Sequence, residues 1–141
     1  MTARESRPKA MRHRVLIVDD EESMRLFLAR ILVTRMQVEV TLAGTCEQAL
    51  HLAGSYAYDA ILLDLVMPGI GGYEVLKELR RASPNIATPV IIVSVLADKV
   101  TQDRCMTAGA SVCLVKPVER NALVSTLKAQ IAGRSKPKTT G

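Results

Sequence analysis

The chain has 141 residues, with one phenylalanine, three tyrosines and no tryptophan. This length suits one domain with a single core and is too short for two domains of ordinary size. Because aromatic residues are so few, the core must be built from Val, Leu, Ile, Ala and Met, which suits layered α/β packing. The three cysteines, Cys46, Cys105 and Cys113, are odd in number and widely spaced, which argues against a disulfide framework or a zinc site. We expect reduced, mostly buried thiols.

The formal net charge of +5 is concentrated at the two ends of the chain. Residues 1–14 carry +4 and residues 133–141 carry +3, which leaves −2 for the part between them. We expect residues 1–12 to be a disordered basic tail and residues 133–141 to be a basic tail or linker remnant, with no direct binding to nucleic acid. No apolar run approaches the roughly 18 residues of a membrane span, and the N-terminal segment lacks the apolar centre of a signal peptide. We therefore expect a cytoplasmic protein with no membrane partner.

Apolar runs without alternation predict strands that are buried on both faces, as in a parallel sheet covered by helices. Four such strands are expected, at residues 15–18, 61–64, 90–94 and 112–116. A further strand contains Val38, Val40 and Leu42 in alternation with polar residues, which indicates a position nearer a sheet edge.

Apolar residues at helical spacing predict a helix after each strand. The helices are expected from Ser23, from Thr45, over residues 73–82, over residues 98–108 and from residue 118 to residue 132. Thr45 and Gln48 have the spacing of a capping box at the start of the second helix. We expect Gly54, Gly109 and Gly133 to end the second, fourth and fifth helices.

Five strands that alternate with five helices imply right-handed crossovers and a doubly wound parallel sheet. The carboxyl ends of parallel strands lie at one edge of the sheet, where open α/β folds place their ligands. Polar residues follow four of the apolar runs: Asp19 and Asp20, Asp64, Ser94, and Lys116. We therefore expect these five residues to meet in one pocket.

Few ligands and reactions suit such a pocket. Three carboxylates repel one another unless a cation lies among them, and oxygen ligands suit Mg²⁺. A carboxylate can also act as a nucleophile and form an aspartyl phosphate. A phosphoryl group in transfer needs positive charge and hydrogen-bond donors around its oxygens, which Lys116, Ser94 and a metal ion would supply.

Over residues 13–132 the chain resembles the receiver domain of two-component response regulators, of the chemotaxis-receiver type. The motifs that carry the resemblance are Val18–Asp20, Leu63–Gly69, Ser94 and Lys116–Pro117, in the order and spacing of the family. The resemblance implies a flavodoxin-like fold of five βα units with the strand order 2-1-3-4-5. It also implies a phosphoacceptor signalling domain rather than an enzyme, with at most self-catalysed phosphorylation and dephosphorylation.

The resemblance assigns a role to each residue of the metal site. Asp20 and Asp64 would bind Mg²⁺ directly, and Asp19 would bind it largely through water. Val66 would add its backbone carbonyl oxygen as a further ligand.

The resemblance also assigns the phosphoryl chemistry. Asp64 would accept a phosphoryl group from the phosphohistidine of a histidine kinase or a phosphotransfer protein. Ser94 would donate a hydrogen bond to a phosphoryl oxygen after switching, and Lys116 would pair with the phosphate. We expect the Lys116–Pro117 peptide bond to be cis, because a tight turn after the last strand would direct the lysine back to the pocket.

Two positions depart from the family pattern. Cys113 stands where an aromatic residue commonly moves during activation, and Val95 stands where a small residue leaves the site open. We expect a small rearrangement and restricted access to the site. The downstream protein partner is expected to bind the fourth helix, fifth strand and fifth helix, and no output domain is expected after Gly133.

Two other functions remain open at this stage. The departures at Cys113 and Val95 would also suit a receiver fold that binds proteins constitutively, without phosphorylation. A flavodoxin-like cofactor binder would need Ser, Thr or Gly phosphate contacts in its first loop, and the acidic segment Asp19–Glu22 argues against it.

Overall fold

The structure is a computed structural model that describes residues 12–96 and 98–135. The predicted tails, residues 1–12 and 133–141, lie largely outside these ranges. The elements in chain order are β1 (Arg14–Val18), α1 (Glu22–Met36), β2 (Glu39–Ala43), α2 (Cys46–Ser55), β3 (Ala60–Leu63), α3 (Gly72–Arg81), β4 (Val90–Ser94), α4 (Lys99–Ala108), β5 (Val112–Val115) and α5 (Arg120–Ser135). No helix in the described ranges is long and apolar enough to cross a lipid bilayer.

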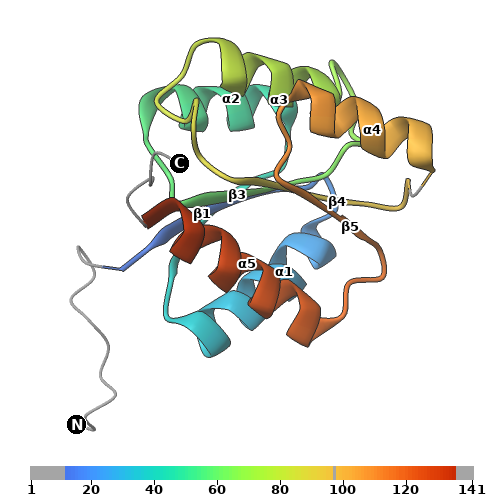
Figure 1. The fold of residues 1–141 in the computed structure, drawn as a ribbon. Helices are drawn as coiled ribbons and strands as arrows, with labels where there is room; N and C mark the ends of the chain where they lie inside the picture. The colour runs from blue at the N-terminus through green and yellow to red at the C-terminus, as the bar shows by residue number, and fades with distance from the viewer. Residues whose placement is uncertain (1–11, 97, 136–141) are drawn as a thin grey trace, which may run out of the picture.

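The five strands form one parallel sheet in the order β2-β1-β3-β4-β5 (Figure 1). The predicted flavodoxin-like fold and strand order are therefore confirmed. The strand that alternates apolar and polar residues, β2, lies at an edge of the sheet as predicted. The strands β1 and β3 lie in the interior, and their register pairs Val18 with Leu63. The residues after these two, Asp19 and Asp64, are consequently neighbours at the carboxyl edge.

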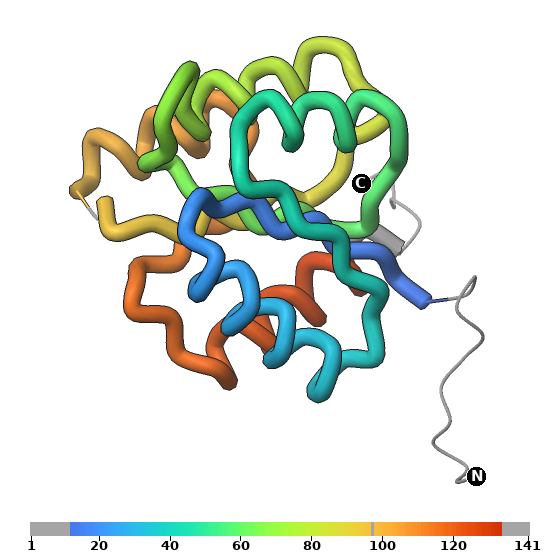
Figure 2. The backbone as a smooth tube through the Cα atoms, turned by 180° about the vertical axis from the view of Figure 1, so that it is seen from behind, coloured from blue at the N-terminus to red at the C-terminus, as the bar shows by residue number. Residues whose placement is uncertain are grey.

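Helices α1 and α5 cover one face of the sheet, and α2, α3 and α4 cover the other (Figures 1 and 2). Side chains alternate between the two faces of a strand, so successive residues of β1 join different cores. Leu16 and Val18 pack with α2, α3 and α4, whereas Val15 and Ile17 pack with α1 and α5. Both cores are mainly aliphatic, as the composition predicts.

Two predicted helix ends are wrong. Helix α2 continues through Gly54 to Ser55, and α5 continues through Gly133 to Ser135. A glycine ends a helix when it adopts the left-handed conformation that other residues avoid. Gly109 does so, with φ of 113°, and ends α4 as predicted, whereas Gly54 and Gly133 do not have a positive φ.

The start of α2 follows the predicted capping box only in part. The backbone N–H of Gln48 donates to the Thr45 hydroxyl over 3.0 Å, as a cap should. The Gln48 side-chain oxygen, however, accepts from the backbone N–H of Gly44 over 2.9 Å rather than from Thr45. This second bond fixes the turn between β2 and α2.

Candidate functional site

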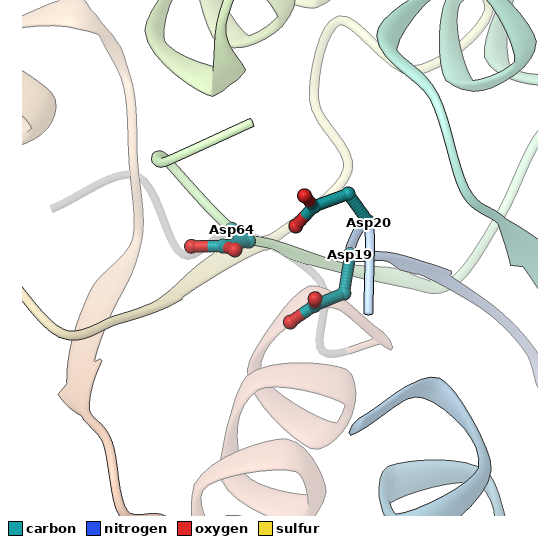
Figure 3. Close-up of side chains that lie close together, drawn as sticks. All are labelled: Asp19, Asp20 and Asp64. Atoms are coloured by element: carbon teal, nitrogen blue, oxygen red, sulfur yellow. The ribbon is translucent and has the colours of Figure 1, made fainter. Parts of the chain in front are cut away.

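Three carboxylates gather at the carboxyl edge of the sheet. Asp19 and Asp20 follow β1, and Asp64 follows β3, where its backbone N–H donates to the carbonyl of Val18 over 3.0 Å. One oxygen from each carboxylate lies within 4.8 Å of the others. Figure 3 shows the three side chains pointing to the same side of the two strand ends. The structure thus brings together the three acidic residues that the sequence singled out.

Asp19 is buried, and each of its polar atoms has a partner. Its side-chain oxygens accept from Lys116 Nζ over 2.8 Å and from the backbone N–H of Glu21 over 2.9 Å. Its backbone N–H donates to the carbonyl of Ala43 over 3.1 Å, and its backbone oxygen accepts from Arg25 Nη1 over 2.8 Å. A carboxylate has about four lone-pair sites, so Asp19 can keep both hydrogen bonds and still accept one from a water molecule bound to a metal ion.

Asp64 is also buried, with 4% of the residue exposed. One carboxylate oxygen accepts from the backbone N–H of Val66 over 3.2 Å, and the other accepts from Lys116 Nζ over 3.4 Å. Burial raises the pKa of Asp64, and the nearby charge of Asp19 adds to this, although Val66 and Lys116 act in the opposite direction. A cation bound beside Asp64 would therefore favour the ionised form that a nucleophile needs.

Lys116 is the cation that joins the acidic residues. It follows β5, and its backbone N–H donates to the Ser94 carbonyl over 2.9 Å. Burial acts to lower the pKa of Lys116, but its hydrogen bonds to Asp19 and Asp64 and their charges raise it overall. The side chain is thus held as an ammonium ion. The Lys116–Pro117 peptide bond is cis, as predicted.

Ser94 completes the set at the end of β4. The residue is 1% exposed, and its hydroxyl oxygen accepts from the backbone N–H of Leu96 over 3.2 Å. The next side chain, Val95, is 62% exposed. Cys113 on β5 is half-buried, and its side chain packs against the core that lies below α2, α3 and α4.

Two residues that support the site were not predicted from the sequence. Any side chain at Gly72 would overlap the carbonyl oxygen of Asp64, so only glycine lets α3 start this close to the strand end. The Cys46 thiol donates to the carbonyl of Pro68 over 3.7 Å, which ties α2 to the loop after Asp64. The pair Gly71–Gly72 before a helix was the one sequence signal for the close approach of Gly72 to Asp64.

The residues present fit a magnesium ion. The donors are carboxylate oxygens, which Mg²⁺ prefers, and they include no sulfur or nitrogen ligand. Asp20 is exposed, whereas Asp19 and Asp64 are buried, so the group of carboxylates is accessible to solvent from one side. Mg²⁺ usually keeps several water ligands, which such an opening permits.

A comparison with protein families finds the response regulator receiver domain over residues 15–128. The chain belongs to this family. Its members are phosphoacceptor signalling domains, which are generally not catalytic enzymes, and which bind Mg²⁺ in their acidic site and interact with histidine kinases and downstream effectors.

Similar proteins include a sensory/regulatory protein and a response regulator. Sensory/regulatory protein RpfC of Xanthomonas campestris pv. campestris is 37% identical over 116 residues, which are 81% of this chain and 16% of RpfC. Response regulator GacA of Pseudomonas aeruginosa is 33% identical over 122 residues, which are 86% of this chain and 56% of GacA. The chain thus spans about half or less of the length of these relatives.

A similar solved structure is the receiver domain of sensor histidine kinase PA1611 from Pseudomonas aeruginosa PAO1, with a magnesium ion coordinated in its active site cleft. The TM-score is 0.79 with 28% sequence identity, and the match covers 86% of this chain and 98% of that domain. Fold and family therefore agree with the arrangement of the acidic residues described above.

Proposed function

We propose that Asp64 accepts a phosphoryl group from the phosphohistidine of a histidine kinase or phosphotransfer protein. The observation that carries this proposal is the contact of one ammonium ion, Lys116, with both buried carboxylates, at 2.8 Å from Asp19 and 3.4 Å from Asp64. The contact supports the proposal because Lys116 can bind a phosphoryl oxygen while an adjacent carboxylate oxygen of Asp64 attacks phosphorus.

In the transfer, a carboxylate oxygen of Asp64 attacks phosphorus while the phosphorus–nitrogen bond of the donor breaks. The histidine nitrogen keeps the electron pair of that bond, so the product is an aspartyl phosphate and an imidazole. Bound Mg²⁺, held directly by Asp20, Asp64 and the carbonyl of Val66 and through water by Asp19, would offset the negative charge of the carboxylates and phosphoryl oxygens.

Two further side chains would bind the product. Lys116 would exchange its bond to Asp64 for a bond to a phosphoryl oxygen, and its pairing with Asp19 keeps it at the site. The Ser94 hydroxyl now accepts from Leu96, and its own proton is available for a phosphoryl oxygen. A hydrogen bond to a charged acceptor contributes about 1.5–3 kcal/mol, enough to draw Ser94 and the following loop inward.

The state of Asp64 would be transmitted by protein contacts on α4, β5 and α5. Exposed apolar side chains on this side support the proposal, namely Val95, Leu96, Val100, Met106 and Val115. Because Cys113 is too small to take the place of an aromatic switch, the state dependence of this surface should be modest. We place the protein in the cytoplasm and propose no direct contact with nucleic acid.

Phosphate-affinity electrophoresis after treatment with acetyl phosphate tests the proposal. We expect a Mg²⁺-dependent mobility shift in the unaltered protein and none in the Asp64→Asn variant. An exposed acid on α4, Asp103, provides the matched control, because Asp103→Asn should leave the shift intact. A mobility shift that persists in EDTA or in Asp64→Asn would contradict the proposal. The absence of a shift in every form of the protein would favour a receiver that binds proteins constitutively.

A further inference from the structure

The side chain of Arg25, on α1, is directed at the acidic turn without pairing with a carboxylate. Its Nη1 donates to the backbone oxygen of Asp19 over 2.8 Å. None of the ion pairs found among the described residues includes Arg25. The guanidinium therefore acts on the main chain of the turn that connects β1 to α1.

The oxygen that Arg25 binds belongs to the peptide unit between Asp19 and Asp20. A peptide unit is planar, so fixing its oxygen fixes the plane from which the Asp20 backbone continues. Within the described residues, no hydrogen bond or ion pair holds the Asp20 carboxylate, and this residue is exposed. The direction of the Asp20 side chain thus depends on its backbone.

We propose that Arg25 is a positioning residue that orients Asp20 for the metal through the Asp19–Asp20 peptide. This inference rests on the proposed function, because the metal is the ligand for which Asp20 is oriented. Residues that hydrogen-bond to a metal ligand without binding the metal themselves affect metal affinity. Removing such a residue typically lowers the affinity about 10- to 100-fold.

Gly44 supplies the space that the guanidinium needs. A Cβ at Gly44 would lie 2.8 Å from Arg25 Nη1 and 3.2 Å from Cζ, both too close. The φ of Gly44 is not in the left-handed region, so the requirement for glycine here is one of space. Gly44 is itself fixed by its hydrogen bond to Gln48, and so cannot readily move away.

The Arg25 guanidinium lies between two turns at the carboxyl edge of the sheet. The turn after β1 is already bonded to the end of β2 through Asp19 N–H and the Ala43 carbonyl, 3.1 Å apart. The Arg25 guanidinium lies beside Gly44, the next residue along the chain. The metal-binding turn is thus held by the end of β2 through Ala43 and by its own helix through Arg25.

The contact allows a variant that should alter the site and leave the fold intact. In Gly44→Ala, the new methyl group meets the end of a flexible side chain, which can move aside at little cost to folding. Moving it breaks the bond to Asp19. Arg25→Met removes the guanidinium directly and keeps most of the apolar stem.

Two matched controls lie on α1 and α2. Arg30 is an exposed arginine on α1, and a Cβ added at Gly54 on α2 would meet no atom within 4 Å. Arg30→Met and Gly54→Ala repeat the two chemical changes away from the acidic turn. Both should leave Mg²⁺ binding unchanged.

The measurement is a titration of the backbone amide resonances of residues 64–72 with MgCl₂, with no phosphoryl donor present. We expect the dissociation constant for Mg²⁺ to rise about tenfold in Arg25→Met and in Gly44→Ala. The double variant should bind as weakly as Arg25→Met alone, because the alanine then has no guanidinium to displace. With Mg²⁺ at saturation, the rate of labelling by acetyl phosphate should return to that of the unaltered protein.

An unchanged dissociation constant in folded Gly44→Ala or Arg25→Met would overturn the inference, and so would additive losses in the double variant. Gly44→Ala alone decides the matter if Arg25→Met does not fold. Failure of the proposed function gives a different result: acetyl phosphate would then not label the unaltered protein, whereas the effect of the two variants on the dissociation constant for Mg²⁺ could still be measured.

Discussion

Lys116 has the largest electrostatic role of any single side chain at the site. It bonds two buried carboxylates, and removal of one partner from a buried ion pair leaves uncompensated charge. We predict that Lys116→Met lowers the free energy of unfolding by about 3 kcal/mol at neutral pH without metal. Lys128 is an exposed lysine on α5, and Lys128→Met should change it by less than about 0.5 kcal/mol. Urea unfolding measures both, and equal effects of the two substitutions would contradict this account.

The raised pKa of Asp64 predicts the direction in which its contribution to stability changes with pH. Because its pKa is raised by burial, the folded protein binds a proton at this carboxyl more tightly than the unfolded chain does. Its contribution to stability is complete below the unfolded pKa, about 3.9, and is lost as the pH rises through the folded value. The stability of metal-free Asp64→Asn relative to the unaltered protein should therefore increase as the pH rises through this range. Unfolding curves at several pH values test this, and a decrease would show that the sign is wrong.

Among the elements, α3 and α4 are joined by one partly buried arginine. The Arg80 guanidinium donates to the carbonyl of Gly109 over 3.0 and 2.8 Å, and to those of Asn85 and Ile86 over 3.0 and 2.8 Å. These bonds connect α3, the loop before β4 and the end of α4. We predict that Arg80→Met lowers the free energy of unfolding by about 2–4 kcal/mol, since hydrogen bonds to charged groups contribute about 1.5–3 kcal/mol each.

The neighbouring residue, Arg81, is the control for Arg80. It is exposed and pairs with Glu78 across one turn of α3 at 2.7 Å. Such surface pairs contribute little, so Arg81→Met should change the free energy of unfolding by no more than about 0.5 kcal/mol. Thermal or urea unfolding of the two variants side by side compares them, and a larger loss in Arg81→Met would reverse the assignment.

Helix α4 has fewer buried residues than any other helix, because Cys105 alone is buried. A phosphoryl group that draws Ser94 inward should therefore shift the loop after β4 and then α4. We predict that beryllofluoride, which mimics the phosphoryl group, changes amide exchange most in residues 95–108. Changes confined to α2 and α3 would place the output surface elsewhere.

At the scale of the whole molecule, the positions of the site residues could be predicted because they result from the topology of the sheet. Once the strands are parallel, Asp19, Asp64, Ser94 and Lys116 share an edge whatever the details of packing. The roles of Arg25 and Arg80 could not be predicted in this way. Their partners are backbone oxygens, which leave no trace in the pattern of residue types, and Arg80 and Gly109 are 29 residues apart.

The errors at the helix ends have a related cause. A glycine permits a left-handed turn but does not impose one, and Gly54 and Gly133 have open space around them within their helices. Whether the chain turns there depends on what the following residues contact. Gly109 ends α4, and the next residue, Ala110, is buried in the core, so the chain turns inward at that point.

The central claim is that Asp64 is the residue that becomes phosphorylated, and one measurement tests it directly. The protein is incubated with acetyl phosphate and Mg²⁺, the acyl phosphate is reduced with borohydride, and peptides are mapped by mass spectrometry. Borohydride converts an aspartyl phosphate to homoserine, which marks the site. We predict homoserine at position 64, absent without Mg²⁺ and absent at Asp19 and Asp20. Homoserine at another aspartate, or none at all, would contradict the account.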